Sequence, residues 1–381
     1  MKVLFLIDSL EGYGAEKSIV QIALAMQTVT PVFIHLYPGE KLKLKLETNG
    51  IKVYSLNINS VYNLQEPIQL IKPILESEKP DIIHSTLFRA DRIARKLKIF
   101  FPEIVLIGSF VSNSYGFNRY RQLGLLAKIK LFTTQLKDKA TAHRVDYFIC
   151  NSNAIKNSNI RALGISDQSV KVIYRGRNFE DQNNSFNYSD NIRQELSLKN
   201  QTVFLNVSRL NKGKGQLDLL EAFAKLLKVN SNIVLLIAGE GSFREILEAK
   251  ISSLNLGAHV YLLGYREDVS NLLKFANYFV FPTYYEGLPG ALIEAIISKT
   301  PIIVSDIPEN IECLANDGAL FFKPGNVSGL FHKLKEALVL ETWPTKTQNS
   351  FDYAKENFEI KKVSKNYEEF YNEIISKKVQ G

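Results

Sequence analysis

The segment EGLPGALIE sets two glutamates, Glu286 and Glu294, on either side of a short turn that contains glycine and proline. The apolar run before it predicts a buried strand, and Pro289 suits the first turn of a helix. Unpaired backbone N–H groups at such a helix start, here residues 287–291, form an anion site that the helix dipole strengthens. Carboxylates accept hydrogen bonds strongly from sugar and ribose hydroxyls. The segment therefore offers two carboxylates and, between them, a backbone site for a phosphate or sugar oxygen; the alternative is a solvated loop with a surface glutamate.

A second cluster of charges follows another apolar run, in SRLNKGKGQL. Arg209, Lys212 and Lys214 alternate with Gly213 and Gly215 before a predicted helix. Positive side chains beside a helix N-terminus suit a diphosphate. The spacing GxxxxGK[ST] of a P-loop is absent. The alternative interpretation is a polar turn with solvated charges.

Two glycine-containing loops also follow predicted strands. Gly239 and Gly241 leave room at a strand end for a base or a ribose, and Ser242 with Glu245 matches the S-x-x-E capping box of a helix start. In the first loop, Gly12 and Gly14 follow a predicted strand and precede a predicted helix. A dinucleotide fingerprint would need a third glycine near position 17, where Lys17 stands, so this loop is weak evidence for NAD.

The remaining polar candidates are few. His84 ends a predicted strand and could face a cleft, although a hydrogen-bonded core histidine is the commoner arrangement. No His/Cys/Asp cluster has metal-ligand spacing, so no metal is expected. Two cysteines, Cys150 and Cys313, cannot build a disulfide framework and favour a reducing, cytoplasmic location. Cys150 is predicted to be a buried strand residue.

A basic stretch from Arg119 to Arg144 interleaves arginines and lysines with leucine, isoleucine and phenylalanine. An amphipathic basic helix of this kind can lie on an anionic membrane. The alternative is a solvated helix face. No run is long and apolar enough to span a membrane, and the first apolar run breaks at Asp8, too early for a signal peptide.

The order of elements predicts an α/β protein built from two Rossmann-like, doubly wound parallel-sheet domains that face each other across a cleft. Continuous apolar runs alternate with helical periodicity on both sides of a polar linker, residues 178–191. We expect domains at residues 1–180 and 181–365, with residues 366–381 forming a helix that returns to the first domain. The predicted strands are Val3–Ile7, Val32–Leu36, Lys52–Leu56, Asp81–His84, Val105–Phe110, Asp146–Cys150, Val203–Val207, Ile233–Ile237, Val260–Leu263, Tyr278–Phe281 and Ile302–Val304.

These motifs, in this order, resemble the retaining glycosyltransferases of family 4, which have the GT-B fold. The most specific element is E-x7-E, here Glu286 and Glu294. SRLxxxKG, from Ser208 to Gly215, and AGEG, from Ala238 to Gly241, add to it. The resemblance covers most of the chain and is densest at residues 202–315.

The resemblance implies a role for each residue. Arg209 and Lys214 would bind the donor diphosphate and stabilise it as it leaves, which makes them catalytic together with Glu286, the ligand of the transferred sugar. Glu294 would hold the ribose. The other donor-binding candidates are Gly14, Gly239, Gly241, Gly287, Leu288, Pro289 and Gly290. Members are generally independent of metals, so Arg209 and Lys214 would take the place of Mg²⁺ in stabilising the diphosphate.

The chain departs from the family pattern in two places. Members usually carry Gly-Gly in the first loop, where this chain has Tyr13 and Gly14. Many also have a histidine after the fifth strand, where this sequence reads Phe110, Val111 and Ser112. With that histidine missing, His84, Ser112 and Asn113 are the acceptor-side candidates.

The expected function is transfer of a sugar from a UDP- or GDP-sugar to a glycan or lipid-linked acceptor, in surface polysaccharide, lipopolysaccharide or glycolipid synthesis. No other cofactor is expected. The location would be cytoplasmic, with peripheral membrane contact through residues 119–144. The alternatives are an epimerase-like enzyme on sugar nucleotides and a non-catalytic partner subunit. Net charge is +8, but no aromatic-basic platform for single-stranded nucleic acid is evident, so nucleic acid is not an expected partner.

Overall fold

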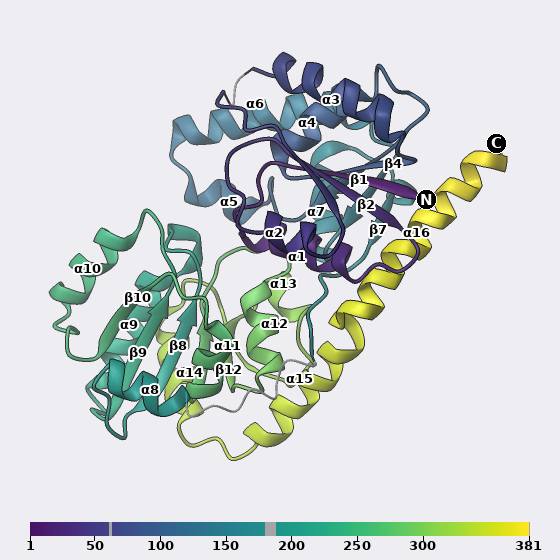
Figure 1. Ribbon diagram of the computed structural model, residues 1–381. Helices are drawn as coiled ribbons and strands as arrows, with labels where there is room; N and C mark the ends of the chain where they lie inside the picture. The colour runs from purple at the N-terminus through teal and green to yellow at the C-terminus, as the bar shows by residue number, and fades with distance from the viewer. Residues whose placement is uncertain (61–62, 180–187, 381) are drawn as a thin grey trace. The chain divides into compact units, whose positions relative to one another are not determined.

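The computed structural model describes residues 1–60, 63–179 and 188–380, and the chain divides into two compact units (Figure 1). Unit 1 contains Met1–Gly116, Leu123–Arg177 and Asn357–Gly381, and unit 2 contains Phe117–Gln122 and Asn178–Glu356. The boundaries expected from the sequence were 180/181 and 365/366.

Unit 1 is built on a seven-stranded parallel sheet in the order β3-β2-β1-β4-β5-β6-β7. Its strands are β1 Lys2–Ile7, β2 Thr30–His35, β3 Lys52–Ser55, β4 Ile82–Thr86, β5 Val105–Phe110, β6 Tyr147–Cys150 and β7 Val170–Val172. The central strands β1 and β4 are buried along nearly their whole length, and β1 is apolar after Lys2, as expected for a parallel sheet with helices on both faces.

The helices of unit 1 are α1 Gly14–Leu24, α2 Lys43–Glu47, α3 Gln65–Glu78, α4 Phe88–Leu97, α6 Leu125–Ala142, α7 Asn153–Leu163 and α16 Ile360–Gln380. Although it ends the sequence, α16 packs on unit 1, where Figure 1 draws it in yellow. Tyr371 is fully buried, and the Glu368 carboxylate accepts hydrogen bonds from the N–H groups of Gln27, Thr28 and Val29. These contacts fix the helix to the loop between α1 and β2.

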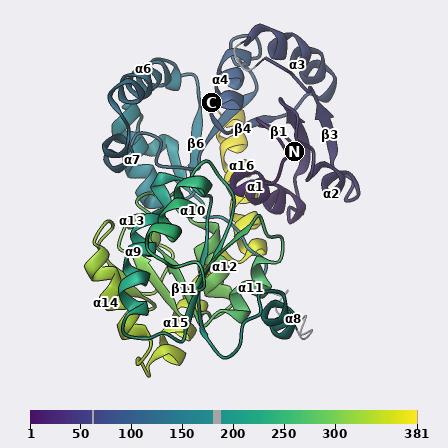
Figure 2. The same ribbon diagram turned by 90° about the vertical axis from the view of Figure 1, so that its left-hand side faces the viewer.

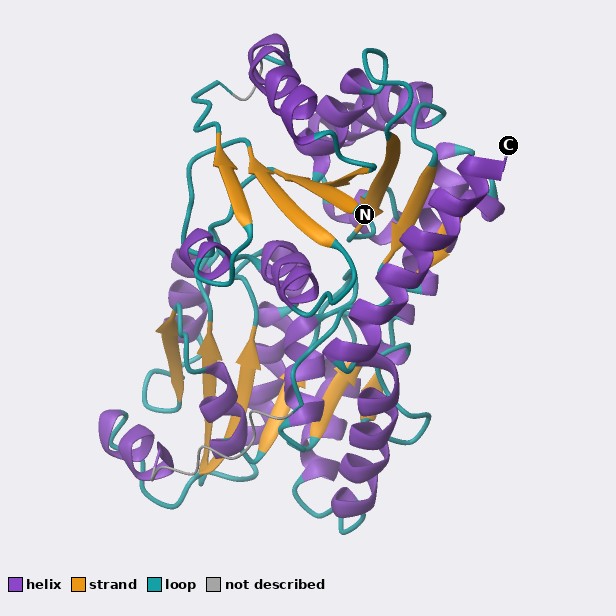
Figure 3. Ribbon diagram, turned by 45° about the vertical axis from the view of Figure 1, so that its right-hand side comes forward, coloured by secondary structure: helices purple, strands orange, loops and turns teal. Residues whose placement is uncertain are grey.

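Unit 2 holds a six-stranded parallel sheet in the order β10-β9-β8-β11-β12-β13. Its strands are β8 Thr202–Val207, β9 Ile233–Ala238, β10 Val260–Gly264, β11 Tyr278–Phe281, β12 Ile302–Ser305 and β13 Leu320–Phe322. Figure 3 shows the arrows of this sheet pointing in one direction. All the carboxyl ends therefore meet at one edge.

The helices of unit 2 are α5 Phe117–Gln122, α8 Tyr188–Glu195, α9 Gln216–Leu227, α10 Arg244–Ser253, α11 Val269–Phe275, α12 Gly290–Ile297, α13 Pro308–Ile311, α14 Val327–Ala337 and α15 Trp343–Phe358, of which α15 ends within unit 1. Helices α9 and α14 pack together on one face of the sheet, and α11 and α12 cover the other (Figure 2).

All eleven predicted strands are present within one or two residues of their predicted bounds, and the prediction of two parallel α/β sheets is confirmed. Cys150 is buried in β6 as predicted. The sequence missed β7 and β13. Each has three residues and lies at the edge of its sheet, where a strand has one neighbour and gives too short an apolar run to be distinguished from a loop.

Two local predictions were wrong. The predicted linker covers residues 178–191, of which 180–187 lie outside the described residues, but its last four belong to α8. That helix packs against α11, with Ile192 buried and Glu195 paired with Arg266. The capping box is also absent, because α10 begins at Arg244 and no side chain caps its first turn.

The basic stretch forms two helices rather than one. Helix α5 belongs to unit 2, and α6 belongs to unit 1. Arg95, almost fully buried in α4, pairs with Asp138 of α6 and Asp91 of α4, both at 2.5 Å. This network anchors the C-terminal half of α6, whereas nearly all its other side chains are exposed or half-buried.

Candidate active site

The order of the strands in unit 2 creates a crevice between β8 and β11. From β8 the chain continues through α9 to β9 on one side, and from β11 it continues through α12 to β12 on the other. The loops after these two neighbouring strands therefore diverge to opposite faces of the sheet. Ligands of open α/β sheets bind at such a switch point, outside the carboxyl ends of the strands.

The loop after β8 is held in shape by its own polar groups. Asn211 accepts a hydrogen bond from Gly213 N–H and caps the short 3₁₀ turn Lys212–Lys214. Gly215 then adopts a φ of +70°, and a Cβ at this position would lie 2.0 Å from the carbonyl oxygen of Pro282. Only glycine fits here without displacing the backbone.

The loop after β11 is tied to the same turn. Both Thr283 Oγ1 and Tyr284 N–H donate to the carbonyl oxygen of Gly213, at 3.1 and 2.9 Å. The two loops therefore hold one another in register, although they are about seventy residues apart in the sequence.

This register brings together two of the predicted catalytic residues. Lys214 Nζ lies 2.5 Å from Glu286 Oε1, and the two side chains are 13% and 12% exposed. A charge pair at this depth is screened less by solvent than a surface pair. A diphosphate could compete with Glu286 for the lysine, and the released carboxylate could then accept hydrogen bonds from hydroxyls.

The other donor candidates of unit 2 lie close to Lys214 or Glu286 in the sequence. Helix α12 begins at Gly290, one residue after the predicted start, with Pro289 at its N-cap position. Gly287 and Leu288 are buried, and Glu294 is half-buried in the second turn of the helix. Arg209 is exposed at the end of β8. The structure therefore places Arg209, Lys214, Glu286 and the start of α12 at the same edge of the sheet.

Gly239 and Gly241 also have a structural use that the sequence did not predict. A Cβ on Gly239 would lie 2.0 Å from the carbonyl oxygen of Ser208, and one on Gly241 would lie 2.2 Å from that of Leu210. Their missing side chains admit the neighbouring loop after β8. The expected contact of these two glycines with a base or a ribose stays a prediction.

In unit 1, Gly14 is the first residue of α1 and is exposed. The carboxylate of Glu16 accepts hydrogen bonds from the N–H groups of Gly12 and Tyr13, at 2.6 and 2.8 Å. Glu16 thus fixes the loop after β1, at the carboxyl edge of the sheet of unit 1.

The acceptor-side candidates differ in how far they are exposed. His84 is fully buried, and its two ring nitrogens lie 2.6 Å from the hydroxyls of Tyr371 and Ser109. This is the core histidine of the alternative interpretation, and burial lowers its pKa to about 3. Ser112 is exposed beside Ser114, and Asn113 accepts a hydrogen bond from Ser158.

Sequence reasoning missed a polar pocket in unit 1. A cavity of about 390 Å³ lies at the carboxyl ends of β1 and β4, and Asp8, Ser9, Tyr37 and Arg89 are among its lining residues. Asp8 accepts a hydrogen bond from Ala90 N–H at the start of α4, and burial raises the pKa of its carboxyl group to about 6. Its place directly after the first buried strand was the available signal.

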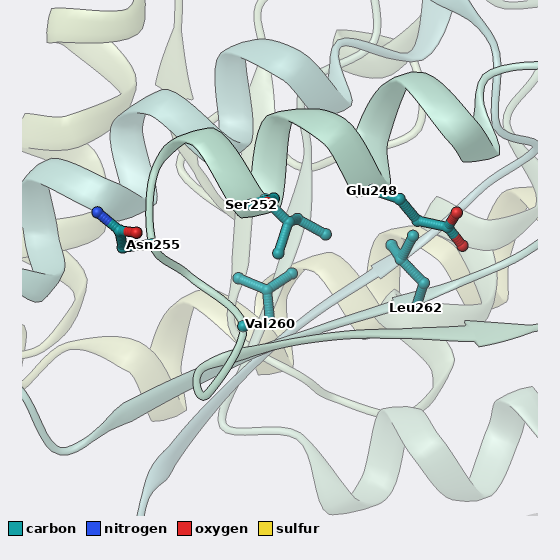
Figure 4. A pocket seen from close by; sticks show the side chains of 7 residues that line it. Glu248, Ser252, Asn255, Val260 and Leu262 are labelled. Carbon is teal, nitrogen blue, oxygen red and sulfur yellow. The ribbon is translucent and has the colours of Figure 1, made fainter.

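A shallower pocket of about 590 Å³ lies between α10 and the edge strand β10 (Figure 4). Ser252 and Glu248 of the helix and Val260 and Leu262 of the strand line it. None of the predicted site residues does so, and Glu248 is paired with Arg244. This pocket is not a candidate for the active site.

Comparison with known proteins identifies the class of this fold. Residues 14–181 match the family described as Glycosyltransferase Family 4, and residues 188–358 match Glycosyl transferases group 1. A crystal structure of HepE from Anabaena, in complex with UDP and glucose, covers 98% of this chain and 100% of its own, with a TM-score of 0.84 and 20% identity. The chain is a glycosyltransferase with the GT-B fold.

Three relatives differ in how much of their length matches. A galactosyltransferase of Escherichia coli that acts on α-D-GlcNAc-diphosphoundecaprenol is 29% identical over 68% of this chain and 66% of its own length. An N-acetylgalactosaminyltransferase of Campylobacter jejuni that acts on an undecaprenol-linked saccharide is 26% identical over 98% and 99%. An uncharacterised glycosyltransferase of Methanocaldococcus jannaschii is 38% identical, but the match spans only 30% of this chain and 29% of that protein.

The raised pKa of Asp8 makes stability depend on pH in this glycosyltransferase. The folded chain holds the proton up to about pH 6, whereas the unfolded chain releases it near 3.8. The contribution of this carboxyl group is therefore fully present below pH 3.8 and is lost as pH rises through 6. We expect Asp8→Asn to raise the free energy of unfolding at pH 7.5 by about 1–3 kcal/mol, and to change it little at pH 4.

Thermal and urea denaturation at the two pH values would measure this difference. Asp167→Asn serves as the control, because this aspartate of the same unit is exposed and its ion pair with Lys156 lies at the surface; it should change the free energy of unfolding by less than about 1 kcal/mol at either pH. An equal effect of Asp8→Asn at both pH values would contradict a buried, protonated Asp8.

Proposed function

We propose that the chain transfers a sugar from a UDP- or GDP-sugar to a glycan or lipid-linked acceptor, with retention of anomeric configuration, in the synthesis of surface polysaccharide or glycolipid. The observation that carries the proposal is the Lys214–Glu286 pair at the switch point of unit 2. The pair offers both charges that a sugar nucleotide needs, a cation for its diphosphate and a carboxylate for its hydroxyls.

Donor binding would exchange the partners of this pair. The diphosphate takes the Lys214 ammonium, and Arg209 adds a second, exposed cation. Glu286 is then free to accept hydrogen bonds from the sugar, while Glu294 in the second turn of α12 accepts them from the ribose. Negative charge develops on the diphosphate as the glycosidic bond breaks, and the two cations stabilise it in the way that a divalent metal would.

The relatives support this assignment and point to the kind of acceptor. The Escherichia coli and Campylobacter relatives are named for transfer to undecaprenol-linked sugars with formation of α-linkages. The E. coli name gives UDP-Gal as donor, and the Anabaena structure holds UDP. On this proposal, unit 2 binds the donor and unit 1 binds the acceptor, and the chain belongs to the retaining enzymes of family 4 with their E-x7-E motif.

Lys214→Ala tests the phosphate role. We expect it to weaken UDP binding by about 10- to 100-fold, because a charge-assisted hydrogen bond to the diphosphate is lost, and to leave uridine binding nearly unchanged. Isothermal titration calorimetry with both ligands measures the two affinities. Lys225→Ala, at an exposed lysine of α9, is the matched control. Equal losses for UDP and uridine would contradict the assignment.

We also propose that α6 holds the chain on an anionic membrane. Its Leu125, Leu126, Ile129, Phe132 and Leu136 are between 50% and 83% exposed and recur at helical spacing on one face. Lys128, Lys130 and Lys137 are exposed around them. Burial of apolar side chains at the lipid surface, together with attraction of lysines to anionic headgroups, favours peripheral binding. In the part of the chain that the structure describes, no helix is long and apolar enough to cross a membrane.

Sedimentation with phosphatidylglycerol-containing vesicles at low salt tests this proposal. The double variant Leu126→Gln/Phe132→Gln should reduce binding by about tenfold or more, since two buried apolar side chains are lost. High salt should weaken binding of the unchanged chain. Leu44→Gln, at an equally exposed leucine of unit 1, should bind as the unchanged chain does. If the α6 double variant and Leu44→Gln both bound the vesicles as well as the unchanged chain, a role for α6 would be contradicted.

A further inference from the structure

A cavity of about 760 Å³ opens on unit 2 next to the donor motif. Its polar wall comes from Gln216 and Asp218 in the first turn of α9, Tyr284 after β11, Asp306 after β12, and Gln122 of α5. We refer to it as the Asp218 pocket. Arg209, Lys214, Glu286 and Glu294 are not among its lining residues, so the donor roles proposed above leave this cavity without a ligand.

Two buried amide oxygens line the Asp218 pocket without a partner. Gln216 is 1% exposed, and its Nε2 donates to Ser208 Oγ and to the carbonyl oxygen of Arg209. Because that carbonyl can only accept, the orientation of the amide is fixed and its Oε1 is left as an unused acceptor. The Oε1 of Gln122 is likewise buried and unpaired. Unpaired buried polar atoms are uncommon in native proteins.

The carboxylates of the pocket add further acceptor capacity. Asp218 accepts a hydrogen bond from the Tyr284 hydroxyl, which is only one of the hydrogen bonds that a carboxylate can accept. Asp306 is paired with the exposed Lys323. Burial raises the pKa of Asp218, as it does that of Tyr284. The inner wall therefore presents oxygen acceptors and requires a ligand that supplies hydrogen-bond donors.

A neutral saccharide meets this requirement. Each of its hydroxyls can donate a hydrogen bond, and the faces of its rings can pack on the apolar and aromatic parts of the wall, which Phe243, Pro308 and Pro324 supply. A phosphate offers the wrong chemistry for the inner wall, since its oxygens would face carboxylates and amide oxygens. Lys212 and Arg121, the cations among the lining residues, are exposed. The volume lies within the range of small-molecule sites.

We propose that the Asp218 pocket is a saccharide-binding subsite of unit 2, separate from the acceptor site proposed for unit 1, which holds one further sugar ring of the glycan while the donor motif holds the nucleotide. The proposal adds to the function proposed above a second place where the chain binds carbohydrate. Binding of a saccharide can be measured without transfer. The subsite can therefore fail its test while the transferase function stands, and the transferase function can fail while saccharide binding stands.

Saturation-transfer NMR with methyl α-glycosides of glucose, galactose, N-acetylglucosamine and N-acetylgalactosamine tests this subsite. The spectra are recorded for the full chain with and without saturating UDP. At least one glycoside should bind in the presence of UDP. Asp218→Asn and Gln122→Leu should each weaken the binding of that glycoside by about fivefold or more, because each removes a hydrogen-bond acceptor. UDP affinity should be unchanged in both variants.

Glu248→Gln, which alters the open pocket on α10, is the control and should bind the glycoside normally. Three results would overturn the proposal. The first is that no glycoside binds, in which case water alone fills the pocket. The second is that UDP displaces the glycoside, which would place it in the donor site. The third is that neither Asp218→Asn nor Gln122→Leu changes its affinity.

Discussion

The hydrogen bonds that the carbonyl oxygen of Gly213 accepts from Thr283 and Tyr284 are the constraint on which the proposed donor site depends. They join the loop after β8 to the loop after β11, so that Lys214 meets Glu286. The close approach requires Gly215, whose missing side chain admits the backbone of Pro282. Without this join, the parallel sheet would still align its strand ends, but cation and carboxylate would not share one crevice.

The pairing has a consequence for how the donor enters. In the structure each charge satisfies the other, and both are shielded from solvent. A sugar nucleotide brings a diphosphate for the cation and hydroxyls for the carboxylate, and so it replaces one favourable contact with two. A ligand with only one of these groups leaves either Lys214 or Glu286 without its partner, which costs free energy at a buried position. On the proposed function, that difference would make the site selective for the complete donor.

The sequence predicted the fold well because it rests on local patterns. Continuous apolar runs with helical segments between them define the parallel strands, and all eleven that were expected are present. The candidate donor residues could be named from their spacing and from family resemblance, but the contact between Lys214 and Glu286 could not be predicted. Lys214 and Glu286 are 72 residues apart, and their contact follows from which strands are neighbours. Gly239 shows the same limit, since the loop that needs its small size is distant in sequence.

Burial explains most of what sequence alone could not give. His84 fits either a cleft or a core until Tyr371, from the last helix of the chain, is seen beside it. Asp8 follows a strand in the way that many solvated aspartates do, and its raised pKa comes from the walls of its pocket. The unpaired oxygens of Gln122 and Gln216 have no signature in sequence at all, because they are defined by partners that the fold does not supply.

The central claim is that Glu286 acts on the transferred sugar after the donor diphosphate has taken Lys214. The most direct test compares the unchanged chain with Glu286→Gln. It measures the release of UDP or GDP from a panel of sugar nucleotides, with and without undecaprenol-diphosphate-linked sugars as acceptors. The account predicts a loss of turnover of about 100-fold or more, with UDP affinity retained or increased because Lys214 loses its internal partner. Turnover of Glu286→Gln at the unchanged rate, or nucleotide release that needs no acceptor, would contradict it.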